Sequence, residues 1–441
     1  MSTESSSNGA PSRVALVGFG TVGRSVARIL CSGEVPQLCL TRIFNRRIDR
    51  KRVDWVPASV QWTDSIEDAL APDIDLVVEL VGGLHPADQW VRAALEAGKS
   101  VVTANKQLIA HRGAELVELA RARGCELRFE ASVAGGVPVL RALQDGLAGD
   151  RLVEVTGIVN GTCAYILSRM ERANLPFAEA LAEAQAAGFA EADPTEDVDG
   201  SDAAAKLAIL TTVGLRRSVR AADIATRSIR PIEKVDFDYA AELGCTIRQI
   251  AYASIGEDDS LFAAVGPALV PLASGFGRVT GSENLVRVRG IFGGETSFLG
   301  SGAGGAPTAV AVVSDLLSIH RASRREGLAS TPVAEHVSAV TGDVFARHYV
   351  RFIARDRPGI IAAVGAAFAR YALNIEAVLQ LPNHPKDRLP FVTTLEPCAD
   401  SAVNRALADI ASLDWAVEPP LSLPMLPLGS RVQPEGGVNA R

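Results

Sequence analysis

Short apolar runs alternate with amphipathic stretches over the first third of the chain. The apolar runs are typical of buried strands and lie at 13–18, 38–44, 74–81 and 100–103. Between them, apolar residues recur at helical spacing over 22–30, 87–97 and 113–123. Alternating strands and helices predict a parallel sheet with right-handed crossovers. We therefore expect an α/β domain over residues 13–135.

The pattern changes from Gly136 onward to a mixture of helices and strands. It predicts a helix at 177–187 and strands at 261–265 and 284–292. We expect a second, mixed α/β domain over 136–303. An apolar helix follows the Gly-rich stretch at 300–305, and we expect residues 304–320 to return to the first domain.

The last quarter of the chain predicts a third, smaller domain at 346–428, after a linker at 321–345. Its elements follow the order strand, helix, strand, strand, helix, strand, which is the ferredoxin-like arrangement. They are expected at 348–355, 359–371, 374–380, 391–396, 402–413 and 415–419. The two ends, a leader at 1–12 and a tail at 429–441, have few large apolar residues and are expected to be disordered.

Composition excludes several classes of protein. The 441 residues are enough for two or three domains, and the net charge of −7 lacks the basic excess of proteins that bind nucleic acid. Neither a secretory signal nor an apolar run of about 20 residues is apparent, so we expect a cytoplasmic protein without a membrane partner. The six cysteines form no CxxC pair, which favours free thiols.

A glycine motif marks the turn between the first strand and the first helix. It is formed by Gly18, Phe19, Gly20, Thr21, Val22 and Gly23, which match GxGxxG. In this position the glycines allow a tight turn, and the helix start favours a phosphate group. The motif predicts a Rossmann-type dinucleotide site, and a Gly-rich turn without a ligand is the alternative.

The end of the second strand indicates which dinucleotide binds. A site for NAD commonly has Asp or Glu there, on the ribose 2′-hydroxyl. This chain has Asn45 and Arg46 instead, followed by further cations. We expect Arg46 to bind the 2′-phosphate of NADP, with NAD as a possible second cofactor. A solvated basic helix start is the alternative.

Three further segments carry candidate chemistry. The stretch 188–202 holds six carboxylates, and Asp202 lies one helical turn before Lys206. Lys106 follows a strand at the edge of the sheet where ligands bind. Glu130 precedes a Gly/Pro segment whose carbonyls can turn toward a cation. The alternative interpretation of Asp202 and Lys206 is an exposed ion pair.

These motifs together resemble the homoserine dehydrogenase family. The similar stretches are GFGTVG at 18–23, TANK at 103–106, EASVAGGVP at 130–138, GIVNGTCAYIL at 157–167, GFAEADPTEDVDGSDAAAKLAIL at 188–210 and GSGAGGAPTA at 300–309. They follow the family order over about three hundred residues. The C-terminal unit, with Asp356-Arg357-Pro358-Gly359 at its first strand-to-helix turn, resembles an ACT domain.

The resemblance implies an enzyme that reduces L-aspartate 4-semialdehyde to L-homoserine with NADPH, on the route to threonine, methionine and isoleucine. Residues 136–303 would bind the substrate and form a dimer. Lys206 would be the general acid and base, supported by Asp202. The implied substrate contacts are Glu191, Lys106 and Thr162. The implied cofactor contacts beyond the motif and Arg46 are Gly82, Lys106 and Gly304.

The resemblance also implies a cation and an effector. Glu130 and the backbones of Val133, Gly135 and Val137 would hold a monovalent cation, Na⁺ in most of the family. An amino acid, with threonine favoured, would bind the ACT domain of a dimer or tetramer. The chain has Thr393-Thr394 where many relatives have Thr-His, which leaves the effector open.

Three other functions compete with this interpretation. One is a Rossmann oxidoreductase for another small amino acid or semialdehyde. The second is a semialdehyde dehydrogenase with Cys163 as its nucleophile, although no His lies near Cys163 in the sequence. The third is an amino-acid sensor that binds NADP without catalysis.

Overall fold

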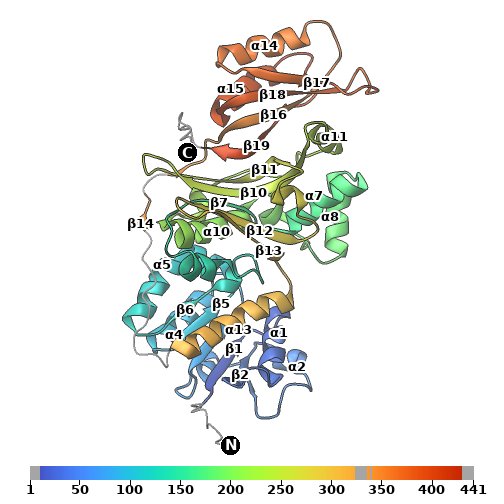
Figure 1. Cartoon of the computed structure of the whole chain (residues 1–441). Helices are drawn as coiled ribbons and strands as arrows, with labels where there is room; N and C mark the ends of the chain where they lie inside the picture. Colours follow the sequence, from blue (N-terminus) through green and yellow to red (C-terminus); the bar gives the residue numbers. More distant parts are fainter. Residues whose placement is uncertain (1–9, 323–334, 338–339, 430–441) are drawn as a thin grey trace, which may run out of the picture. The chain divides into compact units, whose positions relative to one another are not determined.

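The computed structural model describes residues 10–322, 335–337 and 340–429, which fall into two compact units (Figure 1). The first unit comprises Met1–Ala148 and Gly300–Val333, and the second comprises Gly149–Leu299 and Ala334–Arg441. Nearly all of the expected leader and tail, and much of the expected linker, lie outside the described residues. Ser12, which we assigned to the leader, already belongs to the first strand.

The first unit is built on a six-stranded parallel sheet in the order β3-β2-β1-β4-β5-β6. Its strands are β1 (Ser12–Val17), β2 (Leu38–Phe44), β3 (Gln61–Thr63), β4 (Leu76–Glu79), β5 (Ser100–Thr103) and β6 (Leu127–Arg128). The strand order reverses between β1 and β4. Such a switch point is where doubly wound sheets bind dinucleotides, at the carboxyl ends of the strands.

Helices connect these strands. They are α1 (Thr21–Cys31), α2 (Ile48–Lys51), α3 (Ile66–Ala69), α4 (Ala87–Glu96) and α5 (Lys106–Ala122). Three of them, α1, α4 and α5, overlap the predicted stretches. Helix α5 begins earlier than the predicted 113–123 because Asn105 caps it, with its Oδ1 accepting from the N–H of Leu108 at 3.1 Å. The helix start therefore lies directly after β5.

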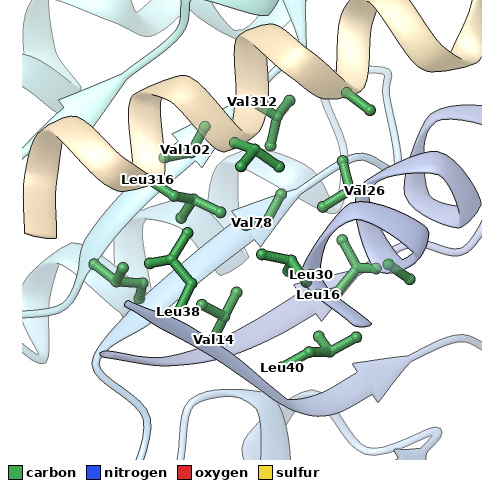
Figure 2. Close-up of a cluster of buried hydrophobic side chains, with 14 of the residues drawn as sticks. Val14, Leu16, Val26, Leu30, Leu38, Leu40, Val78, Val102, Val312 and Leu316 are labelled. Atoms are coloured by element: carbon green, nitrogen blue, oxygen red, sulfur yellow. The ribbon is translucent and has the colours of Figure 1, made fainter. Parts of the chain in front are cut away.

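Helix α13 (Gly305–Ala322) completes the core of the first unit (Figure 2). Its buried Val312 and Leu316 belong to the same apolar cluster as Val14 of β1 and Val26 of α1. The helix starts against α1, because a Cβ on Gly305 would lie 2.7 Å from the Oγ of Ser25. A segment distant in sequence thus joins the motif turn to the core.

The second unit begins with a sheet in the order β13-β12-β7-β10-β11. Its strands are β7 (Leu152–Ile158), β10 (Cys245–Ile255), β11 (Leu261–Pro271), β12 (Glu283–Gly290) and β13 (Gly294–Ser301). The main helices are α7 (Gly161–Ala173), α8 (Phe177–Ala186), α9 (Thr195–Val198), α10 (Ser201–Leu210) and α11 (Lys234–Glu242). Apolar side chains of α7, α8 and α11 share a core with Ile247 of β10 and Leu269 of β11.

The C-terminal part has the ferredoxin-like order of elements. These are β16 (Phe345–Ala354), α14 (Ile360–Arg370), β17 (Ile375–Leu379), β18 (Leu389–Ala399), α15 (Asp400–Ala411) and β19 (Leu421–Gly429). Their sheet order is β19-β16-β18-β17. Strand β19 also pairs with β11 through Leu269 and Met425, so this sheet continues the preceding one.

The predicted last strand at 415–419 is wrong. In that range only an isolated bridge joins Ala416 to Ala354, and the strand that completes the sheet is β19. Pro419 and Pro420 lie between this bridge and β19, and pairing with β16 resumes at Leu421. Trp415 is buried and contributes its ring to the core instead.

The remaining elements are short. They are α6 (Val139–Arg141), α12 (Gly275–Arg278), β8 (Arg217–Ser218), β9 (Ala225–Thr226), β14 (Glu335–His336) and β15 (Val340–Thr341), with helical turns at Glu130–Ser132, Ala142–Gly146, Thr211–Leu215 and Ala221–Asp223. None of the helices in the described part of the chain is long and apolar enough to cross a membrane.

Candidate functional site

The glycine motif forms the turn from β1 to α1, and its three glycines have different roles. Gly18 has φ +106°, and a Cβ there would lie 2.8 Å from the carbonyl oxygen of Leu80. A Cβ on Gly23 would lie 2.2 Å from the oxygen of Gly18. At Gly20 a Cβ would meet no heavy atom within 4 Å. The lack of a side chain at Gly18 and Gly23 therefore lets the backbone segments pack closely, whereas at Gly20 it leaves unoccupied space beside the turn.

The first turn of α1 offers backbone donors at this open space. Gly20 is the N-cap and supplies no side-chain cap, so N–H groups of the first turn are not satisfied by a capping side chain. Phe19 is fully buried and packs edge-on against Trp62, with ring centroids 4.8 Å apart. Phe19 therefore supports the turn through its packing, and the start of α1 can offer backbone N–H groups to a phosphate.

Arg46 lies just beyond β2, where a NAD site commonly has an acidic residue. Its side chain is exposed. The preceding Asn45 turns the chain there, because its Oδ1 accepts from the N–H of Arg47 at 3.1 Å. Among the described residues, no carboxylate forms an ion pair with Arg46. The guanidinium can therefore bind a phosphate group.

Glu79, which the sequence analysis did not identify, ties together the loops after β4 and β5. One carboxylate oxygen accepts from the N–H groups of Val81 and Gly82 at 2.7 and 3.1 Å, and the other accepts from the hydroxyl of Thr103 at 2.6 Å. Asn105 adds a bond from its Nδ2 to the oxygen of Gly83 at 2.6 Å. This network fixes Gly82 near the edge of the sheet.

Lys106 is the first residue of α5 and follows directly on this network. Asn105 caps the turn of α5 that contains Lys106, so Lys106 lies at the carboxyl end of β5. The structure therefore places Gly82, Lys106 and the glycine motif at the same edge of one parallel sheet. That edge is where a dinucleotide binds in such folds.

The second unit holds the pair of Asp202 and Lys206 on α10. Lys206 Nζ lies 2.7 Å from Asp202 Oδ2 and donates a second hydrogen bond to the oxygen of Val159 at 2.9 Å. The side chains are only 14% and 2% exposed, respectively. The alternative of an exposed ion pair is therefore wrong, because the pair is largely shielded from solvent.

Asn160, which we did not predict as a site residue, connects this pair to a second carboxylate. Its Nδ2 donates to Asp202 Oδ2 at 2.7 Å and to Asp197 Oδ1 at 2.6 Å. Its Oδ1 caps α7 by accepting from the N–H of Cys163 at 2.8 Å. An Asn before a helix is a common cap, but the sequence alone does not reveal contacts with 197 and 202.

Hydrogen bonds hold the acidic loop at 188–199, which contains Asp197, one of the two carboxylates bound by Asn160. Thr162 donates from its hydroxyl to the oxygen of Phe189 at 2.8 Å, and the Phe189 ring stacks on Tyr165 with centroids 4.4 Å apart. Gln185 donates to the backbone oxygen of Glu191 at 3.1 Å. Thr162 thus orients the loop, and Glu191 presents its side chain to solvent.

Cys163 does not have the properties of a nucleophile. Burial raises the pKa of its thiol well above the usual value, with further upward contributions from Asp197 and Asp202. The thiol donates to the oxygen of Asp197 at 3.2 Å. A reactive thiol needs a lowered pKa, so the structure argues against nucleophilic catalysis by Cys163.

Glu130 lies in the first unit in a buried cluster of charges. Its two carboxylate oxygens accept from the N–H groups of Leu140 and Arg141 at 2.8 and 2.7 Å. Asp315 accepts from the N–H of Glu130 and pairs with Arg141 at 2.7 Å. Burial raises the pKa of Glu130 to about 7, despite the two N–H donors.

The segment after Glu130 is strongly curved. Ala134 and Gly135 both have φ of 54°, and a Cβ on Gly135 would lie 2.5 Å from the oxygen of Gly302. Such consecutive left-handed residues turn carbonyls of the segment in unusual directions. No group of three or more His, Cys, Asp or Glu in the described chain could hold a metal ion. A cation here would depend on Glu130 and backbone carbonyls.

The turn at 356–359 leads into α14 of the C-terminal part. Gly359 is the N-cap of α14, has φ +94° and provides no side-chain cap. In the neighbouring β18, the hydroxyls of Thr393 and Thr394 are buried without a hydrogen-bond partner. Because no side chain caps α14, its first turn can offer N–H groups to an anion.

Comparisons with known proteins cover nearly all of the chain. Residues 18–130 match the family model described as "Homoserine dehydrogenase, NAD binding domain", and residues 138–317 match the one described as "Homoserine dehydrogenase". Residues 348–413 match the ACT domain. These ranges follow the order of the three domains that the sequence predicts.

Individual relatives agree with these matches. The chain is 37% identical to the homoserine dehydrogenase of Bacillus subtilis, covering 86% of this chain and 89% of the relative. It is 42% identical to that of Mycobacterium bovis, covering 84% of this chain and 86% of the relative. The crystal structure of a homoserine dehydrogenase from Thiobacillus denitrificans superposes with a TM-score of 0.87 at 33% identity, covering 94% and 98% of the two chains.

Proposed function

The chain belongs to the homoserine dehydrogenase family of oxidoreductases, and we propose that Lys206 is its general acid and base. In this proposal the enzyme reduces L-aspartate 4-semialdehyde to L-homoserine with NADPH. The observation that carries it is the shielded contact of 2.7 Å between Lys206 Nζ and Asp202. An ammonium group held in this way can donate a proton from a defined position.

The roles of the residues follow from the reaction. NADPH supplies a hydride to the aldehyde carbon. The aldehyde oxygen then gains negative charge, and Lys206 donates a proton to it. Asp202 and the Val159 carbonyl hold Nζ in place. Glu191 would bind the substrate amino group, Thr162 would shape the edge of the pocket, and Lys106 would contact cofactor and substrate.

NADP is the proposed cofactor, in preference to NAD. Gly18–Gly23, Gly82 and Gly304 would approach the dinucleotide, and the absence of an ion pair at Arg46 among the described residues supports its role on the 2′-phosphate. Gly304 has φ +115° and adjoins the start of α13 at the motif. A guanidinium binds phosphate with two parallel hydrogen bonds, which a 2′-hydroxyl cannot accept.

A monovalent cation, Na⁺ in our proposal, would be held by Glu130 and the backbone of Val133, Gly135 and Val137. The donor set fits, because carboxylate and carbonyl oxygens suit a hard cation. Burial, with a further contribution from Asp315, raises the pKa of Glu130, and a bound cation would oppose both effects. The cation would stabilise this turn and take no part in hydride transfer.

The ACT domain would bind an amino acid, and threonine is the proposed effector. The support is the uncapped start of α14 at Gly359, which can receive a carboxylate. The proposed assembly is a dimer or tetramer. Cytoplasmic location remains an expectation from the sequence.

A single assay tests the proposed activity. The purified chain should oxidise NADPH when L-aspartate 4-semialdehyde is added, and should reduce NADP⁺ with L-homoserine. Turnover of a different aldehyde alone would favour another oxidoreductase. Binding of NADPH without any turnover would favour the amino-acid sensor.

A further inference from the structure

Asn160 uses every polar atom of its side chain in the centre of the second unit. It is 3% exposed and lies between the end of β7 and the start of α7. Its oxygen caps α7, and its nitrogen bonds to two carboxylates that belong to α9 and α10. A helix cap needs only the oxygen, so the two contacts of the nitrogen require a separate explanation.

The amide nitrogen of Asn160 is surrounded by titratable groups, including the proposed acid and base. The titratable groups around it are Asp197 from α9, Asp202 and Lys206 from α10, and the Cys163 thiol from α7. Asp202 Oδ2 accepts from both Lys206 and Asn160. A carboxylate oxygen that is shared between two donors binds each of them less strongly than it would bind one.

The amide also permits two carboxylates to approach the same point. Like charges repel each other strongly when they are shielded from water. Asn160 offsets this repulsion with two N–H groups and adds no charge of its own. A second cation in its place would raise the positive potential beside Lys206, and a carboxylate would raise the negative potential.

We propose that Asn160 is a positioning residue for the acid and base. Its amide nitrogen holds Asp202 against Lys206 and limits how tightly the two carboxylates retain the Lys206 proton. This inference rests on the proposed role of Lys206. It adds Asn160 and Asp197 to the groups that determine the pH range in which the enzyme works.

Two substitutions separate this role from helix capping. Asn160→Asp keeps an oxygen for the Cys163 N–H but places a second oxygen where the nitrogen faces Asp197 and Asp202. Asn160→Ser keeps a capping hydroxyl and removes the nitrogen. Asn374→Asp is a matched control, because Asn374 also donates from Nδ2 to a carboxylate, Glu396 at 3.1 Å, but lies exposed in the C-terminal part.

The measurement is the pH profile of kcat for homoserine oxidation, in which Lys206 must first lose its proton. For Asn160→Asp we expect the half-maximal pH to rise by about one to two units, since a unit charge is added beside the pair. For Asn160→Ser we expect a smaller rise in the same direction. At pH 7 kcat should fall by about tenfold or more in Asn160→Asp and by less in Asn160→Ser, with the KM for NADP⁺ of both variants within about twofold of wild type.

The outcomes distinguish the two proposals. If both variants keep the wild-type profile and kcat and only their melting temperature falls, Asn160 is a helix cap and the inference is overturned. If Asn160→Asp does not fold, Asn160→Ser decides alone. Lys206→Ala is measured in parallel: full activity of that variant overturns the role of Lys206, whereas an inactive Lys206→Ala with unchanged Asn160 variants overturns only the inference. Asn374→Asp should match wild type throughout.

Discussion

Lys206 donates a hydrogen bond to Asp202 from one helical turn further along α10, and both side chains are largely withdrawn from water. An exposed pair at this spacing contributes only about 0.2–0.5 kcal/mol to helix stability. Shielding the charges costs desolvation energy that such a contact often does not repay. The burial of this pair therefore favours the proposed role in proton transfer over a role in stability.

The cofactor preference is tested by Arg46→Ala. Wild type should use NADPH better than NADH, and the variant should narrow this difference by about 1–3 kcal/mol, because a charge-assisted contact to the 2′-phosphate is lost. The measurement is kcat/KM for each cofactor. Arg42→Ala is a control, since Arg42 pairs with Asp73 instead. Equal use of both cofactors by wild type would contradict the assignment.

The proposed cation site is tested by the pH dependence of stability. The folded pKa of Glu130, about 7, lies above its ordinary value of 4.5. Its contribution to stability is therefore complete below pH 4.5 and is lost as the pH rises through 7, by about 3 kcal/mol. A bound cation should restore part of this loss. We expect Na⁺ to raise the melting temperature at pH 8 more than at pH 5, compared with tetramethylammonium at equal ionic strength.

Glu130→Gln provides the matched comparison for this prediction. The variant has no carboxylate to ionise, so the Na⁺ effect at pH 8 should disappear. Glu115→Gln changes an exposed carboxylate on α5 and should respond as wild type does. If Na⁺ stabilises Glu130→Gln as strongly as wild type, Glu130 is not part of the site.

A buried ion pair joins the C-terminal part to α11. Asp236 is fully buried, has its pKa raised to about 6 by burial, and accepts from Arg351 at 2.6 Å and from Tyr349 at 2.8 Å. Arg351→Met should lower the free energy of unfolding by about 3–5 kcal/mol, because Asp236 loses its partner. Adding Asp236→Asn to that variant should recover most of the loss.

Chemical denaturation measures these changes. The control is Arg347→Met on the same strand, which breaks an exposed pair with Glu376 and should cost about 0–1 kcal/mol. If Arg351→Met costs no more than Arg347→Met, the buried pair does not stabilise the contact between β16 and α11.

Threonine should inhibit wild type by about 5–150-fold, the usual range of allosteric coupling. Removing the ACT domain would take away Tyr349 and Leu423 and expose Tyr239 of α11, with which they share a core. A point substitution is therefore the better test. Gly359→Val places a β-branched side chain at φ +94° and should weaken inhibition while leaving uninhibited activity within about twofold. If no amino acid shifts the melting temperature of wild type, the domain has no effector role.

Much of the first unit could be predicted from the sequence because its strands are continuous apolar runs. Strands β2 and β5 have the predicted bounds. Strand β10 was not predicted, because the buried polar residues Arg248 and Gln249 interrupt its apolar pattern. Arg248 forms an ion pair of 2.9 Å with Glu171 on α7. Folding alone brings these two residues, distant in sequence, close together.

In the candidate site, too, the contacts between residues distant in sequence could not be predicted. The spacing of Asp202 and Lys206 could be seen in the sequence, because both lie on one helix face. The roles of Asn160 and Glu79 could not, since their hydrogen bonds reach residues 24 or more positions away in addition to local ones. Which of the six carboxylates at 188–202 turn inward likewise depends on tertiary packing.

The most direct test of the account is the steady-state reduction of L-aspartate 4-semialdehyde by NADPH with wild type and Lys206→Ala, together with the Kd of each for NADPH. We predict that kcat falls by about 10²–10⁴-fold in the variant, the usual contribution of a general acid, while the Kd stays within about twofold. A loss in kcat of less than tenfold, with the Kd unchanged, would contradict the assignment of Lys206 as the acid and base.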